Sequence, residues 1–235
     1  MNGRIACDWW KCANAFNNDK KMKKIIFALC LMFFLVEPAL AHQPRLIFQL
    51  PNPTAENPIV IEKPEISQAF YGKLNGQPDY FELELNKPGE IYFSLLSPDI
   101  PNAYKDFQLF ADEKLFLDGS KKEWTIFYEE FGGDNYWQGP QEKIQLPEGN
   151  HSLAVKNEKN QGKYVLVVGT EESFPVGEAW NAVKSLPSLK KDFFERSVFT
   201  AYSNRIGIFL AISILIFFAI LVGIIFLIKK IKNNL

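Results

Sequence analysis

The stretch DYFELELNKPGEIYFSLL, residues 79–96, carries the pattern that decides the fold. Phe81, Leu83 and Leu85 alternate with polar or amphipathic residues, and after a Lys-Pro-Gly tripeptide the alternation resumes at Ile91. A period of two is typical of a strand with one buried face, and Pro-Gly is typical of a turn. The stretch therefore predicts two strands joined by a turn.

The same alternation recurs further along the chain, with turn residues spaced roughly eight to twelve positions apart. DFQLFADEKLFLDG, residues 106–119, repeats it around Asp112-Glu113. KIQLPEGNHSLAVKNEKNQGKYVLVVG, residues 143–169, adds three strands separated by two turns. Many short strands with such spacing indicate an all-β, mostly antiparallel domain of the β-sandwich or jelly-roll-like type.

We expect this β-sandwich domain over residues 66–170. Residues 42–65 precede it and contain four prolines, at positions 51, 53, 58 and 64. Because proline cannot donate a hydrogen bond to a neighbouring strand, such a segment is suited to a sheet edge or a lead-in.

The N-terminal part carries a secretory signal. Residues 22–41, MKKIIFALCLMFFLVEPALA, combine a lysine pair, an apolar run over residues 25–36 and Ala39-Leu40-Ala41, which fits a cleavage site. That run reaches only about 18 Å as a helix, which is too short to span a bilayer. Residues 1–21 lack this pattern, and we interpret them as an over-called extension, with translation beginning at Met22.

The C-terminal part predicts a membrane anchor. Residues 206–228 contain no charged side chain and are numerous enough for a helix that spans a bilayer, and the tail over residues 229–235 is basic. Because basic tails stay on the cytoplasmic side, we expect a single-pass type I protein of the cell membrane. The domain then lies outside the cytoplasm, and membrane lipid is one partner, through this helix.

Residues 175–203 show helical spacing in place of alternation. We expect two juxtamembrane helices here, with Pro187 ending the first. The first helix is expected to pack on the sheet, and the second, which contains Phe193 and Phe194, to reach towards lipid.

The expected exterior domain is acidic. Residues 42–205 hold 17 Lys and Arg against 24 Asp and Glu, and 17 minus 24 gives a net charge of −7. An acidic domain is a poor binder of phosphate backbones, so nucleic acid is not an expected partner. The three cysteines, Cys7, Cys12 and Cys30, all precede the expected cleavage site, so the processed chain would have neither disulfides nor thiolates. No Walker loop, dinucleotide fingerprint, zincin motif or G-x-S-x-G elbow occurs, and we predict no catalytic residue.

Two segments carry a resemblance to a known family. YGKLNGQPDYFELELNKPGEIYFSLLSP, residues 71–98, and NQGKYVLVVG, residues 160–169, resemble bacterial secreted β-sandwiches of the pre-peptidase C-terminal type. The shared features are a G-x-L…D-x-[FY] opening, an apolar strand after a P-G turn and a closing G-x-Y strand. The resemblance covers roughly residues 66–169 and implies a small non-catalytic jelly-roll-like module. The membrane helix is a departure from that family's pattern.

The stretch FYEEFGGDNYWQGP, residues 127–140, concentrates aromatic, acidic and glycine residues. One interpretation is a glycine-rich turn between two strands, with aromatics packed on the domain. A second is a contact surface for a protein or a glycan, with Tyr128, Asp134, Tyr136 and Trp137 as candidate residues. Calcium is a third, because Glu129, Glu130, Asp134 and Asn135 offer oxygen ligands, although their spacing is not that of a calcium loop.

Histidine suggests a different chemistry. Cleavage after Ala41 would make His42 the N-terminal residue, whose amine and ring nitrogen together can hold copper. His151 is the other histidine of the chain and the candidate second ligand. The sequence therefore leaves two functions open. One is a membrane-anchored extracytoplasmic binding or interaction module without catalytic activity and of unknown ligand. The other is a copper-binding protein or enzyme that uses this histidine pair.

Overall fold

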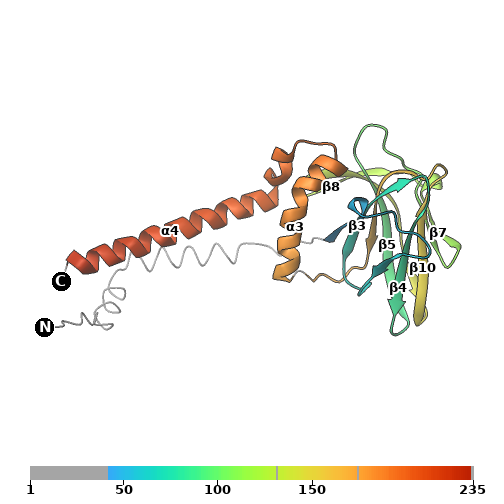
Figure 1. Cartoon of the computed structure of the whole chain (residues 1–235), viewed down its shortest axis with the longest axis horizontal. Helices are drawn as coiled ribbons and strands as arrows, with labels where there is room; N and C mark the ends of the chain where they lie inside the picture. Colours follow the sequence, from blue (N-terminus) through green and yellow to red (C-terminus); the bar gives the residue numbers. More distant parts are fainter. Residues whose placement is uncertain (1–41, 131, 174, 234–235) are drawn as a thin grey trace. The chain divides into compact units, whose positions relative to one another are not determined.

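The computed structural model describes residues 42–130, 132–173 and 175–233, and it is mostly β, with two sheets and two α-helices (Figure 1). Residues 42–208 belong to one compact unit, and the part of the last helix from Phe209 onward belongs to a second. The predicted N-terminal extension (1–21) and signal segment (22–41) lie outside the described residues. The β-rich character expected from the alternation is confirmed.

The first sheet has six strands in the order β1-β3-β11-β5-β9-β8. Neighbours in this sheet are antiparallel except for the edge strand β1, which runs parallel to β3. The bounds of its strands are β1 Gln43–Leu46, β3 Gln68–Asn75, β5 Gly89–Pro98, β8 Thr125–Glu129, β9 Asp134–Leu146 and β11 Gln161–Val168.

The second sheet has five strands in the order β2-β4-β10-β6-β7. Its edge strand β2 is parallel to β4, and the other neighbours are antiparallel. The proline-rich lead-in thus supplies one edge strand to each sheet, in parallel pairs that the alternation alone did not predict. The bounds are β2 Ile59–Ile61, β4 Asp79–Leu85, β6 Gln108–Ala111, β7 Lys114–Asp118 and β10 Gly149–Lys156.

The stretch at residues 79–96 gives one strand to each sheet. Its first half is β4, in which Phe81, Leu83 and Leu85 are buried as predicted, and its second half is β5. The turn between them therefore carries the chain across the core. Phe81 of the five-stranded sheet meets Phe70 of the six-stranded sheet with ring centroids 5.6 Å apart. Side chains of both sheets share one apolar cluster, which is the main core of the domain.

The six-stranded sheet buries both of its faces. In β11, Tyr164, Leu166 and Val168 enter the main core, whereas Val165 and Val167 point to a second cluster on the opposite face. A strand buried on both faces reads as a continuous apolar run, which explains the sequence YVLVV. The second cluster is completed by residues that follow the sheets in the chain.

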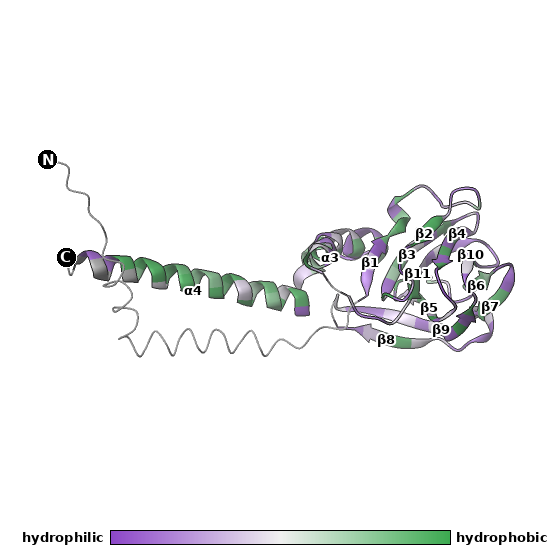
Figure 2. Cartoon of the chain, turned by 90° about the horizontal axis from the view of Figure 1, so that it is seen from below, coloured by the Kyte–Doolittle hydropathy of each residue, from purple (hydrophilic) through white to green (hydrophobic). Residues whose placement is uncertain are grey.

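Those residues, 175–204, are called the neck below. The neck contains three short elements: α3 Val176–Ser188, the π-helical turn η3 Leu189–Phe193 and the 3-10 helix η4 Val198–Tyr202. Two further 3-10 turns, η1 Ile47–Gln49 and η2 Gly119–Lys121, lie between strands. After the neck, α4 covers Arg205–Asn233. Its first 22 residues, Arg205–Phe226, are long and apolar enough to cross a membrane, and Figure 2 shows their nearly continuous hydrophobic character.

The main core contains one carboxyl group. Asp79, at the start of β4, is 2% exposed and accepts a hydrogen bond of 2.7 Å from the hydroxyl of Tyr164 through Oδ2. Tyr164 lies across from Gly72, where an added Cβ would be 2.3 Å from the tyrosine ring, so this packing requires glycine. Burial raises the pKa of Asp79 to about 6, and the bond from Tyr164 opposes that rise only in part. The charged form of Asp79 is therefore unfavourable in the folded chain.

We expect Asp79→Asn to stabilise the protein at neutral pH and not in acid. The pKa of Asp79 rises on folding from an ordinary 3.8 to about 6, so the folded state gains a proton in this window. Its contribution to stability is complete below pH 4 and is lost as pH rises to about 6. One pKa unit is worth about 1.4 kcal/mol, so the variant should gain about 2 to 3 kcal/mol at pH 7.5 relative to pH 4.

Urea unfolding of the full chain in detergent at a series of pH values measures this difference. The matched control is Glu84→Gln, since Glu84 is an exposed carboxylate on the same strand. A gain for Asp79→Asn that does not change between pH 4 and 7.5 would contradict the assignment.

Candidate functional site

The glycine-rich stretch at residues 127–140 forms the β8–β9 hairpin, and it directs most of its candidate contact residues inward. Tyr128 is 55% exposed. Asp134 and Tyr136 are buried, and the hydroxyl of Tyr136 lies 3.1 Å from that of Tyr71. Trp137 is partly buried against the main core and has the Lys105 Nζ 3.0 Å from its ring centroid. As a contact surface for a protein or glycan, this set stays a prediction, with Tyr128 its most accessible member.

Asp134 joins the hairpin to the neck through a buried ion pair. Lys190 of η3 donates to Asp134 Oδ2 over 2.6 Å and to the backbone oxygen of Gly132 over 2.7 Å. Arg196 donates to Asp134 Oδ1 over 3.3 Å. The side chains of Lys190 and Asp134 are only 2% and 4% exposed. We call Lys190, Arg196, Asp134 and Gly132, together with Asn204, the neck joint.

The electrostatics of the joint depend on this pairing. Burial raises the pKa of Asp134, and the hydrogen bond and charge of Lys190, together with the charge of Arg196, oppose the rise. A lysine without a partner at such a site would be strongly disfavoured, because removing a charge from water costs several kcal/mol. Lys190 therefore holds η3 in one place, where both a carboxylate and a carbonyl oxygen accept hydrogen bonds from its ammonium group.

Asn204 connects the joint to the last helix. Its Nδ2 donates to the oxygens of Gly132 and Ala201, over 2.8 Å each, and its Oδ1 accepts from the backbone N–H of Gly207 over 3.0 Å. The contact between Asn204 Oδ1 and the N–H of Gly207 is that of a helix N-cap, and Asn is among the best N-cap residues. The Asn204 side chain therefore caps the start of α4 and also binds the β8–β9 hairpin. Gly133 has φ of +70°, and a Cβ there would lie 3.0 Å from Asn204 Cβ.

Sequence reasoning missed Lys190 and Asn204. Asn204 could have been found, because it lies two positions before the apolar run, at a typical N-cap position. Lys190 gave no such signal, since it is one of two adjacent lysines and only the fold distinguishes it from Lys191, which is exposed.

Apolar contacts surround the joint and correct the expected role of the second juxtamembrane helix. Leu189, Phe193 and Phe194, expected to reach towards lipid, are buried on the six-stranded sheet. Phe194 meets Tyr136 and Phe193 meets Tyr71, both edge to face, with centroids 5.2 and 5.1 Å apart. The expectation was wrong because β11 offers a second apolar face, and these residues pack on it.

Pro187 does not end the first helix. The helix α3 continues to Ser188, with Pro187 inside its last turn, and leads directly into η3. A proline lacks the N–H that would bond the carbonyl four residues earlier, here that of Val183. The hydroxyl of Tyr202 donates to that carbonyl over 3.3 Å and so ties η4 to α3.

The acids of the hairpin serve other contacts. Glu129 accepts from the backbone N–H of Gly132 over 2.6 Å, and Glu130 forms an ion pair with Arg205. With Asp134 engaged by Lys190, the four oxygen-bearing residues weighed for calcium are not gathered around one point. Across residues 42–130, 132–173 and 175–233, no three His, Cys, Asp or Glu side chains are grouped to hold a metal ion.

His42 precedes β1, and His151 lies on β10. His42 Nδ1 contacts the hydroxyl of Ser67. His151, on β10, has Nδ1 2.8 Å from Asp112 Oδ2 and Nε2 3.0 Å from the oxygen of Pro147. Burial alone would lower the pKa of His151, but these two acceptors raise it above its ordinary value. Copper binding by His151 would require one of these contacts to break, and the copper site stays a prediction.

A groove opens where the edge strands of both sheets meet the neck. It has a volume of about 420 Å³, and residues of β1, η1, β2, β3 and α3 line it. Buried Ile47 and Phe70 form part of its lining, together with Leu50 and Val60, which are 52% and 57% exposed.

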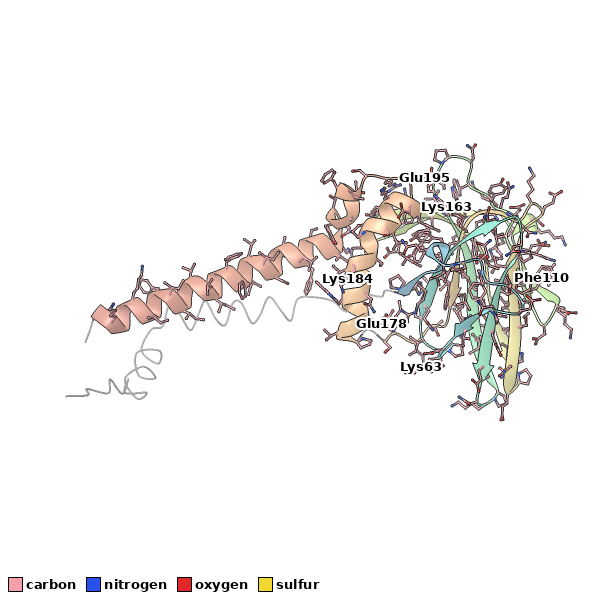
Figure 3. All side chains as sticks on the ribbon, viewed as in Figure 1. Lys63, Phe110, Lys163, Glu178, Lys184 and Glu195 are labelled. Carbon is pink, nitrogen blue, oxygen red and sulfur yellow. The ribbon has the colours of Figure 1, made fainter. Side chains whose placement is uncertain are left out.

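Polar side chains complete the groove. Arg45 Nη1 donates to Glu178 Oε2 over 2.8 Å, and the same guanidinium reaches Gln43 Oε1 over 2.6 Å. Glu178 of α3 and Lys63, both lining residues, are labelled in Figure 3. A groove of this size with an apolar wall and a few fixed polar groups has the character of a binding site.

No family model and no curated protein matches the chain. Among solved structures, a β-glucosidase from Kluyveromyces marxianus matches at 16% identity over 47% of this chain, with a TM-score of 0.29. The pre-peptidase C-terminal domain of collagenase from Bacillus anthracis matches at 13% identity over 50% of this chain and 98% of its own, also with a TM-score of 0.29. The catalytic domain of a GH87 α-1,3-glucanase matches at 17% identity, 45% coverage and a TM-score of 0.27.

The chain spans only 13% of the β-glucosidase and 22% of the glucanase. The pre-peptidase domain is of the type that the motifs at residues 71–98 and 160–169 resemble. With TM-scores this low, these likenesses assign no function to the chain.

We expect Lys190→Met to destabilise the domain by about 3 to 5 kcal/mol, because it leaves Asp134 buried beside a carbonyl without its main counter-charge. The double variant Lys190→Met/Asp134→Leu should lose less than the sum of the two single losses. Chemical unfolding of the full chain in detergent, monitored by circular dichroism, gives the four values of the cycle.

The matched control is Lys143→Met. Lys143 pairs with Glu90 over 3.0 Å, but both side chains are more than half exposed, so the loss should stay below about 1 kcal/mol. Equal losses for Lys190→Met and Lys143→Met would refute the special role of the joint.

Proposed function

We propose that this protein is a membrane-anchored extracytoplasmic interaction module without catalytic activity, and that it binds a segment of another protein in the groove beside α3. The observation that carries the proposal is the groove itself, with its apolar wall and its ion-paired Arg45 and Glu178. The anchor is α4, and the β-rich domain presents the groove outside the cytoplasm.

The length and composition of α4 support the anchor. The 22 residues from Arg205 to Phe226 rise about 33 Å as a helix, close to a hydrocarbon core of roughly 30 Å. Lys229, Lys230 and Lys232 follow the span, and the positive-inside rule assigns such a tail to the cytoplasm.

The lining of the groove favours a protein segment over a glycan. Among the lining residues that the structure describes, the exposed apolar ones are aliphatic, Leu50 and Val60, and the aromatic one, Phe70, is only 2% exposed. Sugar sites present aromatic rings on which a pyranose stacks, whereas aliphatic walls suit apolar side chains. The groove also runs past β1 and β2, which are edge strands of the two sheets and can accept an added strand.

We include the finer fold assignment in the same proposal. The two sheets constitute a β-sandwich with jelly-roll-like character, related in architecture to the pre-peptidase type. The main core shared by the sheets supports the sandwich, and the motifs at residues 71–98 and 160–169 support the pre-peptidase type.

We expect a photo-reactive amino acid at Val60 to crosslink a partner in native membranes. A matched control position is Leu115, which is 45% exposed on β7, the opposite edge strand of the same sheet. A discrete adduct should form from position 60 and not from position 115, and Leu50→Arg, which places a charge in the apolar wall, should abolish it. Equal adducts from both positions, or none from position 60, would count against the groove.

The anchoring predicts a definite labelling pattern. In a background with Cys7, Cys12 and Cys30 changed to Ala, Lys159→Cys in the exposed β10–β11 turn should react with an impermeant maleimide in intact cells. Lys232→Cys in the tail should react only after the cells are permeabilised. The reverse pattern would overturn the type I orientation.

A further inference from the structure

The neck exposes a set of apolar residues that its packing on the sheet does not use. Val176 and Trp180 of α3 are 88% and 57% exposed, and Phe199 and Tyr202 of η4 are 90% and 45% exposed. Isolated apolar residues are common on protein surfaces, but a group with three aromatic rings marks an interaction surface. We call these four residues and Lys184 the outer face of the neck.

On α3 the outer face follows helical spacing. Val176, Trp180 and Lys184 are each four residues apart and so lie on one side of the helix, while Leu186 is buried. The Lys184 Nζ lies 5.2 Å from the centroid of the Trp180 ring, a cation–π contact, and Figure 3 labels Lys184 on this helix. A tryptophan flanked by a lysine is typical of a segment that lies at a membrane surface.

The two parts of the outer face belong to one rigid surface. The hydroxyl of Tyr202 donates to the carbonyl of Val183, which fixes η4 to α3. Between the exposed Phe199 and Tyr202, Ala201 is fully buried, and Asn204 is held by Gly132. The neck joint therefore fixes the face that η4 exposes.

Chain length places the outer face close to the start of α4. Tyr202 precedes Arg205 by three residues, and each residue extends the chain by at most about 3.5 Å. Tyr202 thus lies within about 10 Å of Arg205, and Phe199 within about 21 Å. The headgroup regions add roughly 10 to 15 Å in total to a hydrocarbon core of about 30 Å, so these aromatics belong near the depth where Trp and Tyr collect in membrane proteins.

We propose that the outer face of the neck is a lipid-binding surface that lies in the headgroup region of the membrane crossed by α4. The proposal rests on the proposed anchoring by α4 and adds a second, interfacial contact to it. Trp180, Phe199, Tyr202 and Val176 insert their apolar parts among the upper acyl chains, and Lys184 and Arg205 face the phosphates. The occupant is lipid, because the outer face is continuous in sequence with a membrane span and combines aromatic with cationic side chains.

The test uses nitroxide labels on single cysteines in the full chain, with Cys7, Cys12 and Cys30 changed to Ala. The chain is reconstituted in vesicles of phosphatidylcholine and phosphatidylglycerol, and collision rates are measured with oxygen, which concentrates in lipid, and with a water-soluble nickel chelate. The labelled positions are Phe199 and Trp180 on the outer face, Phe217 within α4 and Val60 on β2. Val60 is the matched control, since its exposure equals that of Trp180, at 57%.

Labels at positions 199 and 180 should show an oxygen-to-nickel ratio at least threefold higher than the label at position 60, and the label at position 217 a higher ratio still. Ratios at 199 and 180 equal to that at 60, with a high ratio at 217, would overturn the lipid-binding surface and leave the anchor standing. A low ratio at 217 would overturn the anchor and this proposal with it. Low collision rates with both reagents at 199 and 180 would show that protein covers the face, which also overturns it.

A second measurement needs no label. Lipids brominated near the headgroup should quench the tryptophan fluorescence of the full chain, and Trp180→Phe should remove a larger part of that quenching than Trp137→Phe. Trp137 is the matched control because it is partly buried on the main core under Lys105. Equal losses from the two variants would contradict the proposal even if the labelled chains fold poorly.

Discussion

The buried pair of Lys190 and Asp134 is the constraint on which the arrangement of the neck depends. A charge removed from water must be matched by a partner and by hydrogen bonds, and Lys190 finds both within the β8–β9 hairpin, in the Asp134 carboxylate and the Gly132 oxygen. Because the same Gly132 oxygen also accepts from Asn204, the position of η3 and the beginning of α4 are set by one turn. A displacement of the neck would therefore break the ion pair of Lys190 and the hydrogen bond of Asn204 together.

Apolar packing and this ionic contact support each other. The second cluster places Phe193 and Phe194 on Val165, Val167 and Tyr136, which excludes water from the joint and strengthens its electrostatic interactions. The ion pair and hydrogen bonds of the joint in turn fix the orientation of the neck, because they depend on direction and apolar contacts do not. The six-stranded sheet therefore has two partners, the five-stranded sheet on one face and the neck on the other, and residues 164–168 of its central strand β11 are all apolar for that reason.

The sequence predicted those features that have a local physical cause. Alternation at residues 79–96 identified the buried side chains of β4, and the glycines at 132 and 133 identified a turn between strands. It did not predict that Lys87-Pro88-Gly89 carries the chain between sheets, or that β1 and β2 pair in parallel, because pairing partners far apart in sequence leave no local pattern. Nor did it predict the groove, whose lining comes from five elements.

Contacts between residues far apart in sequence also decide the roles of the juxtamembrane helices and of the glycine-rich hairpin. Apolar periodicity located the helical segment, but apolar residues that pack on a sheet and those that contact lipid have the same composition. Phe193 and Phe194 were therefore assigned to lipid although they are buried on the sheet. In the hairpin, Asp134 resembled a ligand residue because its partner, Lys190, lies 56 positions away along the chain.

The helix α3 carries residues of both proposed surfaces, since Glu178 pairs with Arg45 in the groove while Trp180 belongs to the outer face of the neck. A helix with its side chains is about 10 Å across, so the groove opens within about one helix diameter of the proposed lipid surface. This proximity favours, as the occupant of the groove, a segment of a protein that is itself held at the membrane, because a partner confined to the same surface meets the groove at a high effective concentration.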